Sequence, residues 1–133
     1  MDSLEKHSEG WTLSIGTTPG YALADQKPML PGEFAEIYKM TAGEIFTETG
    51  VYISAVQREV RMLYNGEWGC PEGGEFGYEL HGVWNPQFSG HDAYFDALRK
   101  LTLKLKQNLR QSAVYLETYP IELSYITGEA ENE

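Results

Sequence analysis

Cysteine occurs only once in this chain of 133 residues, at Cys70. A single cysteine excludes an intramolecular disulfide and is typical of a reducing compartment, so we expect a cytoplasmic location. Long hydrophobic runs are missing as well, because no window reaches the roughly 18 apolar residues that a membrane-spanning helix needs. The opening residues, MDSLEKHSEGW, have neither the basic region nor the apolar run of a signal peptide. We therefore expect a protein without membrane contact.

Basic residues are scarce, ten against 20 acids, which gives a formal net charge of −10. Five of the ten lie in Arg99–Arg110 (RKLTLKLKQNLR), which contains no acid, so the rest of the chain sums to 5 − 20 = −15. An acidic surface disfavours binding to the backbones of DNA and RNA. It favours solubility and permits docking onto basic protein surfaces.

Hydrophobic periodicity divides the chain into strands with alternating apolar residues and helices with an apolar stripe. Glycine and proline mark the connections, above all the glycine-rich stretch Asn65–Glu75. The predicted elements are a strand over 11–17, a helix from Pro31 to Gly50, one long or two short strands over Val51–Tyr64, a strand over Phe76–Trp84, a helix from His91 to Arg110, and a strand over Gln111–Thr118 that Pro120 interrupts and Ile121–Ile126 may extend or pair with at an edge.

This order, β-α-β-β-α-β, predicts an α+β fold of the ferredoxin-like type. Right-handed crossovers would place both helices on one face of a four-stranded antiparallel sheet. Two alternatives remain open, a simple α+β hairpin fold and the same unit paired sheet to sheet in a dimeric barrel. We expect a flexible N-terminus over 1–10, a single domain over 11–127 and a flexible acidic tail over 128–133.

Residues that could carry catalysis do not form a recognisable motif. The possible metal ligands nearest one another lack the paired spacing of a structural zinc site; they are Cys70, Glu72, Glu75, His81, His91 and Asp92. Cys70 is a poor nucleophile, because the surrounding acids, Glu67, Glu72 and Glu75, would raise its pKa. No serine lies in a G-x-S-x-G context. The sequence therefore predicts no catalytic residue, no metal and no cofactor.

Two surfaces are candidates for binding a protein. One is the glycine-rich loop, where Trp68 stands among Glu67, Glu72 and Glu75; the other is the helix surface where Leu103 lies between Arg99 and Arg110. In size and acidic composition, though in no specific motif, the chain resembles the accessory inhibitors that phages and other mobile elements carry. These features favour a non-enzymatic inhibitor or adaptor that occludes a basic partner surface.

The alternative hypothesis is a small-ligand-binding protein or a cofactor-free enzyme built as a dimeric α+β barrel. Its pocket would lie between the sheet and the helices, lined by Tyr52, His81, Trp84 and Tyr115. Alternation places some aromatic rings on the face of the sheet that the helices leave open. That face could also serve a homodimer.

Overall fold

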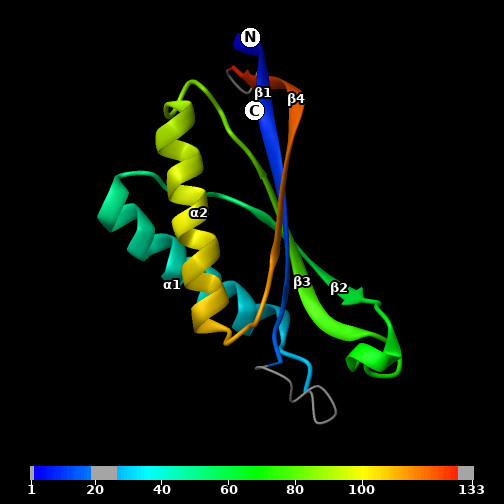
Figure 1. Ribbon diagram of the computed structural model, residues 1–133. Helices are drawn as coiled ribbons and strands as arrows, with labels where there is room; N and C mark the ends of the chain where they lie inside the picture. The colour runs from blue at the N-terminus through cyan, green and yellow to red at the C-terminus, as the bar shows by residue number, and fades with distance from the viewer. Residues whose placement is uncertain (1, 19–26, 129–133) are drawn as a thin grey trace.

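The computed structural model describes residues 2–18 and 27–128. Its elements follow the predicted order (Figure 1). They are β1 (Asp2–Gly16), α1 (Pro31–Thr49), β2 (Val56–Met62), the short 3-10 helix η2 (Gly66–Trp68), β3 (Glu75–Val83), α2 (His91–Asn108) and β4 (Tyr115–Thr127).

The four strands form one antiparallel sheet in the order β2-β3-β1-β4. Both helices lie on the same face of this sheet, and within residues 2–18 and 27–128 the other face carries no helix (Figure 1). The ferredoxin-like α+β prediction is therefore confirmed. Below, the first is called the helix face and the second the open face.

The core lies between the helix face and the two helices. Alternation along β1 puts Trp11, Leu13 and Ile15 on this face, and all three are fully buried. The ring of Trp11 occupies the space above Gly82, its partner on β3, where an added Cβ would come within 2.7 Å of the ring. The helices contribute the apolar stripes that their periodicity predicts; the buried members are Phe34, Tyr38, Thr41, Ala42 and Ile45 on α1, and Tyr94, Phe95, Ala97, Leu98, Leu101, Thr102 and Leu105 on α2.

The first strand is longer than its sequence indicates. Alternation predicts a strand from residue 11, whereas β1 begins at Asp2, which pairs with Thr127 of β4. Pairing with β3 starts only at Gly10, so residues 2–9 form a two-stranded ribbon with β4 beyond the main sheet. Residues 2–9 (DSLEKHSE) contain one apolar residue, Leu4, so no apolar alternation marks this part of the strand in the sequence. Of the predicted acidic tail, residues 129–133 lie outside the described residues.

The last strand runs straight through Pro120, which the sequence suggests as an interruption. Pro120 faces Glu9 of β1, and β4 is an edge strand of the sheet that the described residues form. Proline is tolerated on such an edge strand, because its missing N–H can point away from the ladder. In the other edge strand, only Val56–Met62 of the predicted stretch Val51–Tyr64 pairs with β3.

Candidate functional site

The open face combines exposed apolar side chains with a pair of opposite charges. Arg58 of β2 forms an ion pair with the carboxylate of Glu79, the residue opposite it on β3. Tyr119 of β4 lies over Gly10, and its hydroxyl is 3.0 Å from that of Thr12. Four apolar side chains on this face are at least 39% exposed, namely Val56, Val83, Tyr115 and Tyr119.

One end of the open face gathers polar side chains from three elements around Gly16, the last residue of β1. Glu75, the first residue of β3, accepts a hydrogen bond of 2.9 Å at its Oε1 from the hydroxyl of Tyr64. Its other oxygen, Oε2, lies over Gly16, as does Oε1 of Gln111. Both oxygens occupy the space that a side chain at Gly16 would need. We call Glu75, Tyr64, Gln111 and Gly16 the Glu75 site.

Gln111 reaches this site because of how α2 ends. Arg110 adopts a left-handed conformation with φ 55°, which is uncommon for a residue other than glycine. The backbone N–H of Gln111 then donates to the carbonyl of Lys106 at 2.9 Å, the bond that closes a helix in a Schellman turn. The turn directs the Gln111 amide nitrogen to the carbonyl oxygens of Thr18, at 2.7 Å, and Leu109, at 3.1 Å.

The electrostatics of the Glu75 site favour a positively charged ligand. Partial burial and the hydrogen bond to Glu75 raise the pKa of Tyr64 to about 12, so its hydroxyl stays protonated and keeps donating at neutral pH. The Gln111 amide nitrogen is already used, which leaves its Oε1 as an acceptor. Two acceptor oxygens, one of them anionic, therefore converge over Gly16. Such an arrangement is suited to a cationic group, for example an ammonium that donates hydrogen bonds to both oxygens.

Beside Gly16, the hydroxyl of Thr17 is buried and has no hydrogen-bond partner among the described residues. Buried polar groups are nearly always hydrogen-bonded, and exceptions are found more often at functional sites. Thr17 is therefore a second unusual feature at this end of β1.

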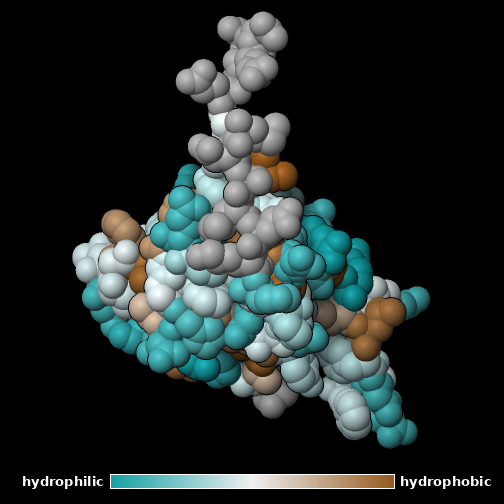
Figure 2. Space-filling view, turned by 90° about the horizontal axis from the view of Figure 1, so that it is seen from above, coloured by the Kyte–Doolittle hydropathy of each residue, from teal (hydrophilic) through white to brown (hydrophobic). Residues whose placement is uncertain are grey.

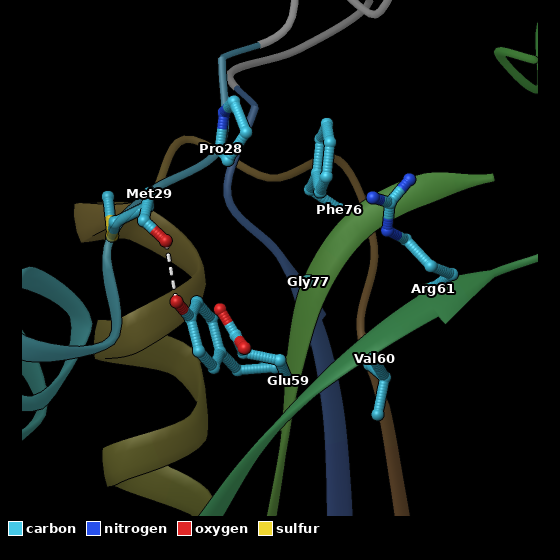
Figure 3. Close-up of a pocket in the computed structure, with 8 residues that line it drawn as sticks. Pro28, Met29, Glu59, Val60, Arg61, Phe76 and Gly77 are labelled. Carbon is cyan, nitrogen blue, oxygen red and sulfur yellow. Dashed lines mark hydrogen bonds between the residues drawn. The ribbon is translucent and has the colours of Figure 1, made fainter. Parts of the chain in front are cut away.

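The hollows on the surface of the described residues include three that concern the site. The largest of these three, about 420 Å³, is lined mainly by apolar and aromatic side chains of the 50–54 segment, the connection from β3 to α2 and β4. A second, about 320 Å³, lies between α1 and the segment leading into β2. The third, about 240 Å³, lies on the helix face at the same end of β3 as the Glu75 site and is lined by Glu59, Arg61, Phe76 and Tyr78, among others (Figure 3).

A separate polar cluster surrounds His91 at the start of α2. One ring nitrogen lies 2.8 Å from the carboxylate of Glu9 and the other 2.9 Å from that of Asp92. The ring also packs edge-on against Trp84 at 5.0 Å between centroids. Hydrogen bonds to Asp92 and Glu9 raise the pKa of His91, because both carboxylates favour the imidazolium. Among the described residues, no group of three or more His, Cys, Asp or Glu side chains could hold a metal ion.

His91 should make the stability of the protein depend on pH near neutrality. Because folding raises its pKa, its contribution is fully present below the unfolded-state pKa, near 6.5, and is lost as pH rises through the higher folded-state pKa. The free energy of unfolding, measured in urea from pH 5.5 to 8.5 (about the range over which histidine titrates), should therefore fall at the upper end. His91→Gln should flatten this decline, and His81→Gln, which removes a histidine from the open face instead, is the control for the loss of one histidine side chain. If the free energy of unfolding of His91→Gln falls with pH as steeply as that of the wild type, His91 is not the group responsible for the pH dependence.

A family model described as SAM lyase matches residues 6–127. The chain belongs to the SAM lyase family. Two solved structures share the fold: a phage SAM lyase in the apo state, with a TM-score of 0.60 and 15% identity over 94% of both chains, and a phage SAM lyase in complex with S-methyl-5'-thioadenosine, with a TM-score of 0.56 and 14% identity over 94% of this chain and 93% of that one. A search of curated proteins finds no match.

Membership of a lyase family overturns the main functional hypothesis from the sequence. The prediction of a non-enzymatic inhibitor or adaptor is wrong, and so is the expectation that the chain is not an enzyme. The error came from treating the acidic charge as a means of occluding a basic partner. The alternative, a small-ligand-binding protein or cofactor-free enzyme, agrees better with the SAM lyase family.

The residues predicted to bind a protein lie on separate parts of the molecule. Trp68 is 75% exposed in η2, at the tip of the β2–β3 hairpin. Leu63, which follows β2 in the same hairpin, is 77% exposed. Figure 2 shows hydrophobic side chains on the part of the molecule that projects to the right in that view. Glu67 and Glu72 are also exposed in this loop, whereas Glu75 is half-buried in the Glu75 site. On α2, Leu103 is 58% exposed, Arg99 pairs with Asp96 at 3.1 Å, and Arg110 forms the left-handed turn.

The four residues predicted to line a pocket do not come together in any of these three hollows. Tyr52 lines both larger hollows, but His81, Trp84 and Tyr115 line none of the three. His81 is exposed on the open face, and Tyr115 is 77% exposed at the start of β4. The indole nitrogen of Trp84 donates to the carbonyl of Ser89 at 2.9 Å. Alternation along a strand predicts which face a residue occupies, but not which segments cover that face.

Sequence reasoning missed most of the Glu75 site of this SAM lyase family member. It named Glu75 as a possible metal ligand and as part of a candidate protein-binding loop, whereas Tyr64 was only the end of one predicted strand stretch and Gln111 only the start of another. The signal that could have found them is their place in the topology. Tyr64 and Glu75 flank the β2–β3 loop. Gly16 is the last residue of β1, and Gln111 follows α2, which ends at the same end of the sheet.

Proposed function

We propose that this protein is a SAM lyase that releases S-methyl-5'-thioadenosine from S-adenosylmethionine. The support is the family match over residues 6–127, together with the fold shared with a phage SAM lyase whose structure holds S-methyl-5'-thioadenosine. The observation on this chain that carries the proposal is the convergence of Glu75 Oε2 and Gln111 Oε1 over Gly16. S-adenosylmethionine brings the sulfonium and ammonium charges that such a pair of oxygens attracts.

The product defines the bond that breaks. S-methyl-5'-thioadenosine keeps the methyl and adenosyl groups, so cleavage occurs between the sulfonium sulfur and the γ-carbon of the amino-acid portion. The electron pair of that bond passes to sulfur, which leaves as a neutral thioether. A lyase adds no water, so we propose that the substrate's own carboxylate oxygen attacks the γ-carbon and closes a five-membered lactone. Sulfonium and carboxylate charges cancel in this step, and no proton is transferred.

The residues of the Glu75 site would bind and orient the substrate rather than react with it. The Glu75 carboxylate would hold the cationic portion of the substrate by charge. The hydroxyl of Tyr64, which donates to Glu75, orients this carboxylate. The bonds to Thr18 and Leu109 fix the amide of Gln111. The overall charge of −10 would in addition attract a substrate with one net positive charge.

The products of the purified protein with S-adenosylmethionine test this proposal directly. Mass spectrometry should detect S-methyl-5'-thioadenosine and the γ-lactone of homoserine in equal amounts. In water enriched in oxygen-18, the freshly formed lactone should carry no label, because its ring oxygen comes from the substrate. No turnover would contradict the proposal, and an open-chain product labelled at the γ-carbon would indicate a hydrolase instead.

Two expectations from the sequence stay predictions within this proposal. One is association of the chain with itself through the open face, which would cover Val56, Val83, Tyr115 and Tyr119. The other is a cytoplasmic location, with which the free thiol of Cys70 agrees. Neither described helix is long and apolar enough to cross a membrane.

A further inference from the structure

The hollow of about 240 Å³ on the helix face places one negative and one positive side chain in the same small space (Figure 3). Glu59 and Arg61 come from β2, two residues apart and therefore on the same side of that strand. Figure 3 shows the Arg61 guanidinium near Phe76, and Glu59 lines the same hollow together with Tyr78. Met29 closes the hollow from the segment that leads into α1.

The two charges are held apart from each other. The Arg61 guanidinium lies 3.8 Å from the centre of the Phe76 ring and donates to the carbonyl of Gly73 at 3.3 Å. Glu59 makes no ion pair or hydrogen bond with any residue in the described part of the chain. The nearby hydroxyl of Tyr78 already donates to the carbonyl of Met29, at 2.5 Å, and so is not available to Glu59. Arg58, next to Glu59 on β2, is instead paired across the open face with Glu79.

The spacing of these charges suits a small zwitterion. Residues two apart on a strand have Cα atoms about 6.7 Å apart, so the side chains can flank one small molecule from two sides. A carboxylate matches the forked guanidinium of Arg61, and an ammonium matches Glu59. The chain is strongly acidic, which disfavours a simple anion, while a simple cation would leave Arg61 unmatched. Phe76 and Met29 offer apolar contact for an attached side chain.

We propose that this hollow is a binding site for a free α-amino acid with an unbranched apolar side chain, held by its ammonium at Glu59 and by its carboxylate at Arg61. The site is separate from the Glu75 site. Glu75 and Phe76 are successive residues of β3 and therefore point to opposite faces of the sheet. The amino acid bound here is thus a second ligand and not the amino-acid portion of a substrate at Glu75. The inference does not rest on the proposed lyase activity.

Calorimetric titration with L-methionine tests this site without any measurement of turnover. L-methionine should bind, whereas N-acetyl-L-methionine, which lacks the ammonium, and L-methioninamide, which lacks the carboxylate, should each bind at least about tenfold more weakly. Glu59→Gln and Arg61→Gln should each weaken L-methionine binding by a similar factor. Arg58→Gln is the matched control, because it removes a positive charge from the same strand on the other face, and it should bind L-methionine as the wild type does.

Three results would overturn the proposal. The first is that no heat of binding is seen up to about 10 mM L-methionine, and the second is that Arg61→Gln and Arg58→Gln bind L-methionine equally well. The third is that Glu75→Gln, a change on the opposite face of the sheet, abolishes L-methionine binding. Amide chemical shifts from an NMR titration give an independent location. They should change at residues 59–61 and 76–78 and stay constant at Gln111.

Discussion

Glu75→Gln should lower kcat/KM for S-adenosylmethionine at least about 100-fold, a loss of roughly 2.7 kcal/mol of transition-state stabilisation. The substitution keeps the shape of the side chain and an oxygen that can accept from Tyr64. It removes the negative charge that, together with Gln111, faces the space over Gly16. The rate of S-methyl-5'-thioadenosine formation measures the effect, and the urea midpoint checks that the fold is intact.

Glu72→Gln provides the matched control for this experiment. Glu72 lies in the same loop and carries the same charge, but it is exposed and has no place in the Glu75 site. Its removal changes the overall charge by the same amount, so any general electrostatic effect should appear equally in both variants. If the two variants retain the same activity, Glu75 has no special role, and the proposed location of the site is wrong even where the wild type is active.

The fold could be predicted because its signals are local. The stripe on α2 from Tyr94 to Leu105 follows the helical period, and the alternation of Trp11, Leu13 and Ile15 follows the strand period. Every one of these residues faces the single core, so pattern and structure agree. The ribbon formed by residues 2–9 and β4 could not be predicted in the same way, since residues 2–9 contain one apolar residue and therefore show no alternation, although their backbone pairs with β4.

The candidate site was harder to predict because its residues are distant in the sequence and chemically ordinary. Tyr64, Glu75 and Gln111 become neighbours only when β3 pairs with β2 and β1, and when α2 ends beside the last residue of β1. The position of Gln111 also depends on a left-handed Arg110, where the sequence offers no glycine to indicate a turn. Moreover, in the proposed reaction the substrate supplies its own nucleophile, so that reaction needs no serine, cysteine or metal motif.

Gly16 of β1 and Gly77 of β3 are partners in the sheet, and substitution by alanine should affect activity at the first and stability at the second. A Cβ at Gly16 would overlap Glu75 Oε2 and come within 2.7 Å of Gln111 Oε1, the ends of two side chains that can shift without any backbone movement if their hydrogen bonds to Tyr64, Thr18 and Leu109 change. A Cβ at Gly77 would come within 2.6 Å of the backbone carbonyl oxygen of Ile15, which cannot move without the strand. The first change displaces the site and the second strains the sheet.

Gly16→Ala should therefore lower kcat/KM by about 100-fold, because misplacement of binding groups by about an ångström costs that much, while the free energy of unfolding changes by less than about 1 kcal/mol. Gly77→Ala should instead destabilise the fold by about 1–3 kcal/mol. Urea unfolding and the rate of S-methyl-5'-thioadenosine formation, measured on both variants, separate the two effects. Equal destabilisation by both would show that Gly16 serves strand packing, because displaced side-chain ends alone carry little cost in stability. A fully active Gly16→Ala would mean that the oxygens of Glu75 and Gln111 need not converge for the reaction.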